Sequence, residues 1–543
     1  MNSNSDNKEF DFQIELGDLH EKAGDLDKSL EYFKSAYDIA VVLKHKRYQV
    51  DALVKITEVY FYKGEIETSI KYAKVTEELL NDIDYVQGKL DISLYLLKVY
   101  SIKNQSFKAR EIGNEALKLC TEEHVIYKGR ILNALANVYS ELTSVDEHLE
   151  LLQQSLQCFE KANFLRGILG ILNNIAVVYA EKLQDNEKAL EYFFKLKERS
   201  EDSNYLEFNM FAYFNIGEVY FKCLKFEEAL LWCKLALEKA EAAHVESIVF
   251  FSYTILISIN INLHNYKEAY TYFNLVNEEL KTYPNQGVAL PWYYKSVASL
   301  LLEFGEIHKA NQNIKHAQEL LGNEETIIKW STGITYEFIK LKEAKNNTEI
   351  LATLQGIKYI LTKYKNQEVI LNIVCATTLE LLNLKQEELA FGLMDEYKYI
   401  ETKREDAILK RKYVEALRCN DEVKEQMLQS ALELAKERSE NKLYLKVCSS
   451  LGEYYFKLND YEKALVYYVY ACIKVKDIVT SVPEEFKVQF INSNAFFESF
   501  NRLIQLRQLY YIKEVESQKE YNCINDEDEL IEFLRDFDKI LKQ

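Results

Sequence analysis

The sequence has few of the residues that let a chain turn sharply, with only three prolines and sixteen glycines in 543 residues. Such a chain has little means of making the many tight connections that a sheet domain needs. A single hydrophobic core stops growing near about 250–300 residues. We therefore expect an almost entirely helical protein without a sheet, built as several domains or as one linear array.

The chain is also poor in positive charge, since its formal net charge is −19 and its pI is near 5.2. Nucleic acids and anionic membranes are bound by clustered basic faces. The first ten residues have neither a basic nor an apolar segment of a signal peptide, and no run of eighteen apolar residues follows. We expect a cytoplasmic protein with no nucleic-acid partner and no membrane partner.

Signatures of catalysis and of metal binding are missing from the sequence. It contains no G-x-G-x-x-G, P-loop, G-x-S-x-G or H-E-x-x-H motif, and no kinase motif set. Its nine cysteines include no C-x-x-C pair, and its histidines do not pair at ligand spacing. We predict no enzymatic activity, no cofactor, no metal and no disulfide.

What the sequence does have is a recurring pattern of small and aromatic residues. In its clearest copy, residues 209–242, the pattern begins at Gly217 and continues with Tyr220, Ala229, Cys233 and Ala236. The same frame returns around Gly17 and around Gly452. Residues three and four apart share one face of a helix. The pattern therefore predicts a hairpin of two packed helices, repeated along the chain.

Eight successive copies are spaced by about forty residues. Their anchor residues are Gly17, Thr57, Leu97, Ala136, Ala176, Gly217, Ile257 and Ala298. From Ala298 to Gly452 the distance is 154 residues, which is four more steps of similar length. The three repeats between these two anchors keep the apolar spacing but lack the full signature. The sequence predicts about twelve hairpins that stack on one another.

This frame resembles the tetratricopeptide repeat (TPR) family. A standard repeat of that family has about 34 residues, and the longer repeat found here resembles that of bacterial TPR signalling proteins and peptide-sensing regulators. The resemblance implies an all-α fold, an α-solenoid that forms a right-handed superhelix. It also implies a non-enzymatic scaffold that binds a protein or peptide in its concave groove.

The expected organisation follows from the repeats and from the prolines. Pro284 and Pro291 bracket a short loop that suits a joint. We expect a disordered N-terminus at 1–9, repeats 1–7 at 10–283, repeats 8–12 at 284–480 with 9–11 degenerate, closing helices at 481–515, and an acidic amphipathic helix at 516–543. The ending resembles the junction between repeats and output domain in large bacterial signalling proteins, but we expect no output domain here.

The groove should be lined by four positions of each first helix, at six and three residues before the anchor and at one and four after it. These positions and their neighbours give an acidic, an amide and an aromatic stretch. The acidic residues are Asp11, Asp18 and Glu58. The middle holds Arg130, Asn133, Asn137, Asn173, Asn174 and Asn215. The aromatic residues are Phe211, Phe214 and Phe221.

Two interpretations of this groove stay open. Asparagine amides can hold the backbone of an extended peptide because they donate and accept hydrogen bonds, and the ladder resembles that of TPR peptide receptors. Alternatively, the asparagines reflect composition and the phenylalanines are ordinary packing. The carboxylate clamp of chaperone-binding TPR proteins needs several Lys and Arg residues, whereas only Arg130 is present, so a ligand held by its C-terminal carboxylate is disfavoured.

Two functions fit these expectations. The first is a protein-interaction scaffold in signalling or regulation. The alternative is a sensory subunit that controls a separately encoded cyclase, kinase or transcription factor. A homodimer is compatible with either function. His148, which takes a position usually held by alanine, is expected to be a packing residue rather than a ligand.

The C-terminal segment after Asn525 carries one apolar stripe at helical spacing. The stripe consists of Leu530, Phe533, Leu534, Phe537, Ile540 and Leu541. Leaving it in water would be costly, so something should cover it. It is either the cap of the solenoid or a recognition helix for a partner or a second protomer.

Overall fold

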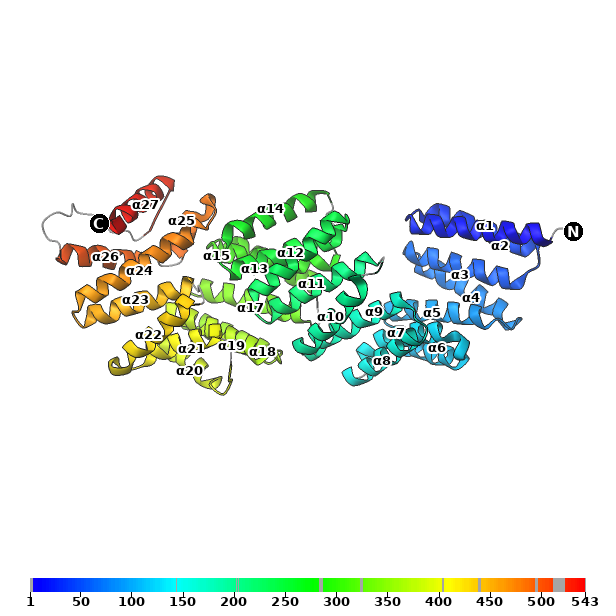
Figure 1. The fold of residues 1–543 in the computed structure, drawn as a ribbon, viewed down its shortest axis with the longest axis horizontal. Helices are drawn as coiled ribbons and strands as arrows, with labels where there is room; N and C mark the ends of the chain where they lie inside the picture. The colour runs from blue at the N-terminus through cyan, green and yellow to red at the C-terminus, as the bar shows by residue number, and fades with distance from the viewer. Residues whose placement is uncertain are drawn as a thin grey trace. The chain divides into compact units, whose positions relative to one another are not determined.

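The protein is all-α, as the sequence predicts. The computed structural model describes residues 3–142, 144–201, 203, 205–282, 287–322, 326–402, 405–437, 441–493, 497–510 and 523–542. Within these ranges the chain forms twenty-seven α-helices and no strand. The first twenty-four helices pair into twelve consecutive hairpins, and three helices follow them (Figure 1). The predicted α-solenoid of about twelve hairpins is confirmed.

The chain divides into two compact units, Met1–Phe208 and Asn209–Gln543. The first unit holds hairpins 1 to 5. Its helices are α1 (Ser3–Lys22), α2 (Leu26–Val42), α3 (Lys46–Tyr62), α4 (Ile66–Asn81), α5 (Val86–Ile102), α6 (Ser106–Leu119), η1 (Glu122–His124), α7 (Val125–Leu142), α8 (Val145–Lys161), α9 (Leu165–Val177), η2 (Val178–Leu183) and α10 (Asn186–Glu201).

The second unit holds the remaining hairpins. They are α11 (Leu206–Lys222) with α12 (Phe226–Ala242), α13 (Glu246–Asn262) with α14 (Tyr266–Thr282), η3 (Gly287–Ala289) and α15 (Leu290–Glu303) with α16 (Ile307–Leu321), α17 (Ile327–Glu343) with α18 (Asn347–Leu361), α19 (Gln367–Asn383) with α20 (Glu387–Glu396), α21 (Glu405–Arg418) with α22 (Asp421–Glu437), and α23 (Asn441–Lys457) with α24 (Tyr461–Thr480).

Three closing helices complete the second unit. A short helix η4 (Glu484–Phe486) begins after Pro483 and leads into α25 (Lys487–Ser493). It is followed by α26 (Phe497–Tyr510) and α27 (Glu527–Lys542). The expected end of the closing helices near Val515, and residues 516–522 of the expected last segment, lie outside the described residues.

The anchors of the repeat pattern lie where the two helices of a hairpin cross. A Cβ added to Gly17 would lie 2.3 Å from the Phe33 ring, and one added to Gly217 would lie 2.5 Å from the Cys233 Sγ and 3.1 Å from its backbone nitrogen. A small residue at this position therefore lets the helices pack in contact. The pattern read from the sequence is the packing pattern of the hairpins.

Short turns close the hairpins through one residue in the left-handed region. Gly24 and Gly64 adopt φ angles of 79° and 76° at the ends of α1 and α3. After α1, the amide of Asp25 donates to the carbonyl of His20, and that of Gly24 donates to the carbonyl of Glu21. These are the bonds that end a helix when a left-handed residue follows it. Each second helix can therefore start within about three residues.

Two details of the first unit differ from a regular repeat. The N-terminal helix begins at Ser3, so the expectation of disorder at 1–9 needs correcting from residue 3 onward. Phe10 explains the difference, because it is 4% exposed and stacks on Tyr48 of the next hairpin with centroids 4.3 Å apart. In the fifth hairpin, α9 continues into the π-helix η2, which ends at Gln184 in the left-handed region.

His148 is buried on α8. Burial lowers its pKa to about 4, so the imidazole is neutral near pH 7. A buried neutral ring is what a packing histidine requires. Among the described residues no group of three or more His, Cys, Asp or Glu side chains is arranged to hold a metal ion. No described helix combines the length and the apolarity needed to cross a membrane.

Candidate functional site

The first helices of successive hairpins are neighbours in the first unit, so their equivalent side chains meet. Helix α1 contacts α3, α3 contacts α5, α5 contacts α7, and α7 contacts α9. The Nζ of Lys55 on α3 lies 2.7 Å from the Oδ1 of Asp18 on α1. We call this surface of α1, α3, α5, α7 and α9 the A-helix face. On this face Asp18, a predicted groove residue, meets a side chain of the next repeat.

Carboxylates dominate the N-terminal part of the A-helix face. Lys55 lies close to Asp18, Glu21, Glu58 and Asp91, and Lys98 lies close to Glu58. The other cations near these carboxylates are Arg130 beside Asp91 and Arg47 beside Asp51. Burial raises the pKa of Glu21, Glu58, Asp51 and Asp91 above their ordinary values. When half-buried carboxylates outnumber the nearby cations, the approach of another cation stabilises their charged form. Asp11 is exposed on α1 at the start of this stretch.

Two tyrosines bind carboxylates of this face in the same way, one repeat apart. The hydroxyl of Tyr85 donates to the Oδ1 of Asp51 at 2.7 Å, and that of Tyr127 donates to the Oδ1 of Asp91 at 2.8 Å. Neither tyrosine was predicted from the sequence. Asp51 and Asp91 each lie six residues before the anchor of their repeat. In contrast, Tyr85 lies twelve residues before Leu97, and Tyr127 lies nine residues before Ala136. The two tyrosines therefore share no common spacing from which they could be predicted.

Two residues of the predicted amide stretch lie side by side on neighbouring helices. The Nδ2 of Asn174 on α9 donates to the Oδ1 of Asn133 on α7 at 3.0 Å. Within the described residues, the Nδ2 of Asn133 and the Oδ1 of Asn174 have no hydrogen-bond partner. The pair therefore presents one donor and one acceptor, as a peptide bond requires. Asn137 is exposed, and both Asn137 and Asn173 take part in further interactions.

The remaining predicted residues lie in different surroundings. Exposed Arg130 places its guanidinium 5.6 Å from the centre of the Phe164 ring. Asn215 belongs to α11 of the second unit, is half-buried and has an interaction of its own. The structure therefore joins Asp18 to Lys55 and Asn133 to Asn174, and it describes Asn215 within the other unit.

The predicted aromatic residues lie half-buried on α11 in the second unit. Phe214 meets Phe251 of α13 at 5.8 Å between ring centres, whereas Phe221 meets Phe226 at the start of α12 at 5.8 Å. Phe211 also packs against the core. These rings contribute to packing between helices, and they do not all face the same neighbour.

Lys295 on α15, at a predicted groove position, is half-buried. Burial alone lowers its pKa to about 8. Because this pKa lies below the unfolded value of 10.5, the unfolded chain binds more protons between about pH 8 and 10.5. The lysine therefore costs stability at neutral pH, and the cost disappears as the pH rises.

We expect Lys295→Met to raise the free energy of unfolding by about 2 kcal/mol at pH 7. This gain in stability should shrink as the pH rises from 8 to above 10.5, because above pH 10.5 Lys295 is neutral in both the folded and the unfolded chain. Urea unfolding of both proteins across this range measures the difference. Lys463→Met, at an exposed lysine on α24, serves as control. A pH-independent gain would contradict the burial effect.

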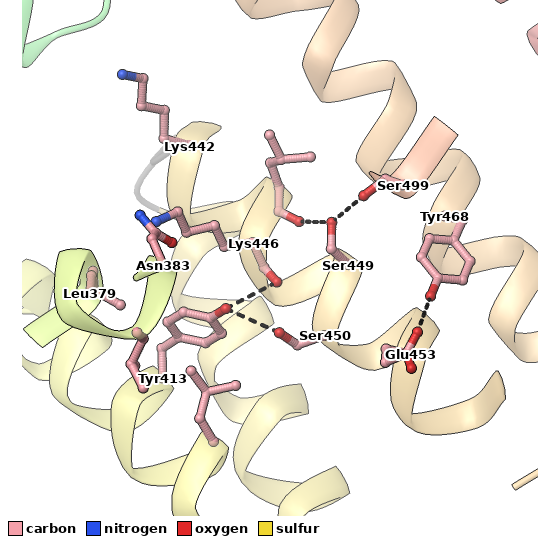
Figure 2. A pocket seen from close by; sticks show the side chains of 13 residues that line it. Leu379, Asn383, Tyr413, Lys442, Lys446, Ser449, Ser450, Glu453, Tyr468 and Ser499 are labelled. Carbon is pink, nitrogen blue, oxygen red and sulfur yellow. Dashed lines mark hydrogen bonds between the residues drawn. The ribbon is translucent and has the colours of Figure 1, made fainter. Parts of the chain in front are cut away.

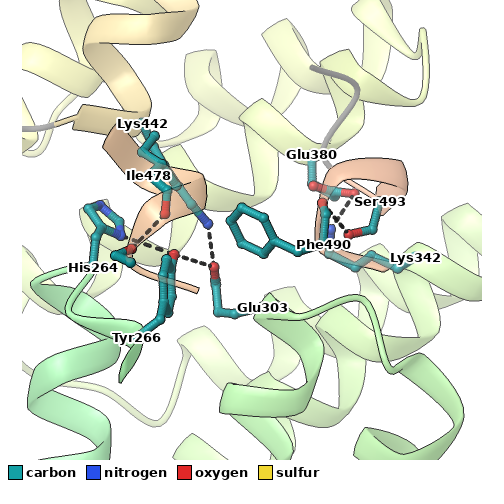
Figure 3. Close-up of polar contacts among 10 residues, drawn as sticks. His264, Tyr266, Glu303, Lys342, Glu380, Lys442, Ile478, Phe490 and Ser493 are labelled. Atoms are coloured by element: carbon teal, nitrogen blue, oxygen red, sulfur yellow. Dashed lines mark hydrogen bonds and ion pairs between the residues drawn. The ribbon is translucent and has the colours of Figure 1, made fainter. Parts of the chain in front are cut away.

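A polar cluster of the second unit joins segments that are far apart in the sequence (Figure 3). Lys442 on α23 forms an ion pair with Glu303 on α15. The hydroxyl of Tyr266 donates to the Oε2 of Glu303 at 3.0 Å, and the Nδ1 of His264 lies 3.2 Å from that hydroxyl. Burial acts to raise the pKa of Glu303, but Lys442 and Tyr266 lower it to about 2 overall.

Comparison with known proteins agrees with the helical-repeat fold. The model of the tetratricopeptide repeat family matches residues 10–40, which include most of α1 and most of α2. Among curated proteins none matches the sequence. A chain of the APC/C hetero-tetramer Cut9–Hcn1 is similar in structure, with a TM-score of 0.53 and 11% identity over 92% of this chain and 96% of that one. This likeness shows the solenoid fold.

Two further structures are similar at lower scores. The apo form of RapI has a TM-score of 0.41 and 16% identity, over 50% of this chain and 97% of that chain. A signal-transduction ATPase with a tetratricopeptide repeat sensor from Pyrococcus horikoshii has a TM-score of 0.41 and 15% identity, over 68% of this chain and 54% of that chain.

Proposed function

Because the chain is a tetratricopeptide-repeat solenoid, we propose that it is a non-enzymatic scaffold that binds an extended segment of a partner protein on the A-helix face of its first unit. The observation that carries this proposal is the amide pair of Asn133 and Asn174. Its free donor and acceptor match those of a peptide backbone in extended conformation. Binding through backbone groups would hold a segment of any sequence.

The acidic part of the same face supplies the specificity. Glu58 is half-buried between α1 and α5 neighbours, and burial raises its pKa although Lys55 and Lys98 are close. A lysine or arginine of the bound segment would stabilise the charged form of Glu58 and of Asp91. We therefore propose that the segment carries basic residues where it crosses α3 and α5.

Selection of random peptides on the full chain tests this proposal. We expect the selected peptides to be rich in Lys and Arg, and Glu58→Gln to weaken their binding roughly tenfold. Asn133→Ala should weaken all of them by about 1 kcal/mol, because it removes a bond to the backbone. Isothermal titration calorimetry provides both numbers.

The matched control is Glu67→Gln. Glu67 is 77% exposed on α4, where it pairs with Lys103. The control variant therefore removes one carboxylate charge, as Glu58→Gln does, but at a position away from the A-helix face. Acidic or purely apolar peptides that bind Glu58→Gln as tightly as the unchanged protein would refute the proposal. A cyclase, kinase or transcription factor that co-purifies and binds through other residues would favour the sensory alternative.

A further inference from the structure

The second unit contains a cavity of about 320 Å³ on the first helices of its last hairpins (Figure 2). This volume is at the lower end of the range for small-molecule sites, roughly 300–1,000 Å³. Its walls come from α19, α21, α23 and α26, together with Tyr468 of α24. The cavity belongs entirely to the second unit and is separate from the A-helix face proposed above.

Charged groups around the cavity leave one positive charge without a partner. Lys442 pairs with Glu303, and Lys342 lies 3.5 Å from Glu380, which also accepts a bond from Asn383. Lys446 lines the cavity and has no hydrogen bond or ion pair from its ammonium group within the described residues. The third carboxylate of the cavity, Glu453, lies 3.4 Å from the Nε of Arg502. The ammonium groups of Lys342, Lys442 and Lys446 therefore have only Glu303 and Glu380 to balance them.

Desolvation makes this imbalance costly. Burial lowers the pKa of Lys446, and although Glu380 attracts the ammonium, the neighbouring Lys442 and Lys342 repel it. A half-buried charge is retained at less cost when an anion neutralises it. The site at Lys446 therefore suits a ligand with a single negative charge.

The other polar groups of the cavity are bonded to one another. The hydroxyl of Ser449 lies 2.6 Å from that of Ser499, and the hydroxyl of Ser450 lies 3.0 Å from that of Tyr413. Glu453 accepts from the hydroxyl of Tyr468 at 3.1 Å. Apart from Lys446, these groups therefore offer a ligand few unpaired hydrogen-bond donors or acceptors.

Leucines form the rest of the wall. They are Leu379, Leu382, Leu417 and Leu445. An aliphatic surface of this kind stabilises a ligand in proportion to the apolar area that it buries. A dianion such as phosphate would leave the leucines uncovered and would bring one charge too many. A carboxylate on an aliphatic body uses both the single cation and the leucines.

We propose that this cavity binds a small aliphatic carboxylate, with the carboxylate on Lys446 and the aliphatic body against the four leucines. Hexanoate is the probe for the full-length protein, measured by thermal unfolding and by isothermal titration calorimetry at constant ionic strength. We expect hexanoate to raise the melting temperature saturably. Hexanamide, which has the same shape without the charge, and inorganic phosphate should not.

Variants at Lys446 decide whether the cavity is the site. Lys446→Met should weaken hexanoate binding roughly tenfold or more, because a charge-assisted bond is lost. Lys446→Arg should retain part of the binding. Lys463→Met, at an exposed lysine of α24, is the matched control and should bind as the unchanged protein does.

The unliganded variant gives a second readout. Lys446→Met should melt at the same or a higher temperature than the unchanged protein, because it removes a charge that has no partner. The proposal is overturned if hexanoate does not bind, if hexanamide or phosphate binds as well as hexanoate, or if Lys446→Met binds hexanoate unchanged. A lower melting temperature of the unliganded variant would assign Lys446 a structural role instead.

Discussion

Tyr266→Ala should lower the free energy of unfolding of the second unit by about 4 kcal/mol, as removal of a fully buried aromatic side chain does. Tyr266 is 0% exposed at the start of α14. Its ring lies 5.9 Å from that of Phe304 and 5.5 Å from that of Phe490, between ring centres. It thus touches the turn of the eighth hairpin and the closing helix α25 at once.

The hydroxyl of Tyr266 adds a smaller, separable contribution. It donates to Glu303, which retains Lys442 as its partner when the hydroxyl is lost. Tyr266→Phe should therefore cost only about 1 kcal/mol. Urea unfolding followed by circular dichroism measures both variants, and Tyr62→Ala, at a tyrosine 54% exposed, is the control. Equal costs for the Ala and Phe variants would contradict a role for ring packing.

This joint between distant segments could not be predicted from the sequence. Glu303 and Lys442 lie 139 positions apart, and Gln489 donates to the carbonyl of Gly305 across 184 positions. The repeat pattern records how each hairpin packs on the next one, because those contacts recur at a fixed spacing. Contacts between the eighth hairpin and the closing helices occur once, so no periodicity marks them.

Local packing, in contrast, was predictable in detail. Gly17, Gly217 and Gly452 stand where a Cβ would meet a side chain of the second helix, and the twelve hairpins follow from them. The reason is physical: a helix crossing needs a small residue at one point, and a short turn needs a residue that tolerates positive φ. Both requirements act within one hairpin, so the residues that meet them recur in the sequence at a constant distance from the anchor.

The candidate sites could be predicted from the sequence only in part. The groove rule placed Asp18 and Asn133 beside the next helix, as their bonds to Lys55 and Asn174 show. The same rule applied to the anchor Gly452 gives Lys446, Ser449 and Glu453, three residues of the cavity. The groove residues predicted from the sequence belong to repeats one to eight only. The cavity also needs leucines from degenerate hairpins without a recognisable anchor, so its apolar wall was not predictable.

The C-terminal helix α27 offers the other large expected effect. Phe533 is 0% exposed, and its ring meets that of Phe500 on α26 at 5.0 Å between centres. Leu530 is 5% exposed on the same stripe, while Phe537, Ile540 and Leu541 have side chains outside the described set. The side-chain Nδ2 of Asn492 donates to the backbone carbonyl of Ile524 at 2.7 Å, and the side-chain Oδ1 of Asn492 accepts from the backbone N–H of Ile524 at 2.8 Å. The helix and the segment before it are thus docked on the closing helices.

Removal of residues 525–543 should therefore lower the melting temperature by several degrees or more, because Phe500 loses its cover and the last hairpin loses its polar-backed cap. Phe533→Ala should cost about 3 kcal/mol on its own, whereas Ile531→Ala, at a residue 61% exposed on the same helix, should cost little. Calorimetry and light scattering on these variants separate the two roles left open by the sequence. A large loss of stability at unchanged mass assigns α27 to the cap, since the docked face is then internal. An unchanged melt with loss of a dimer or of a bound partner would instead assign the helix to recognition, and would mean that the contact between Phe533 and Phe500 contributes little to the folded chain.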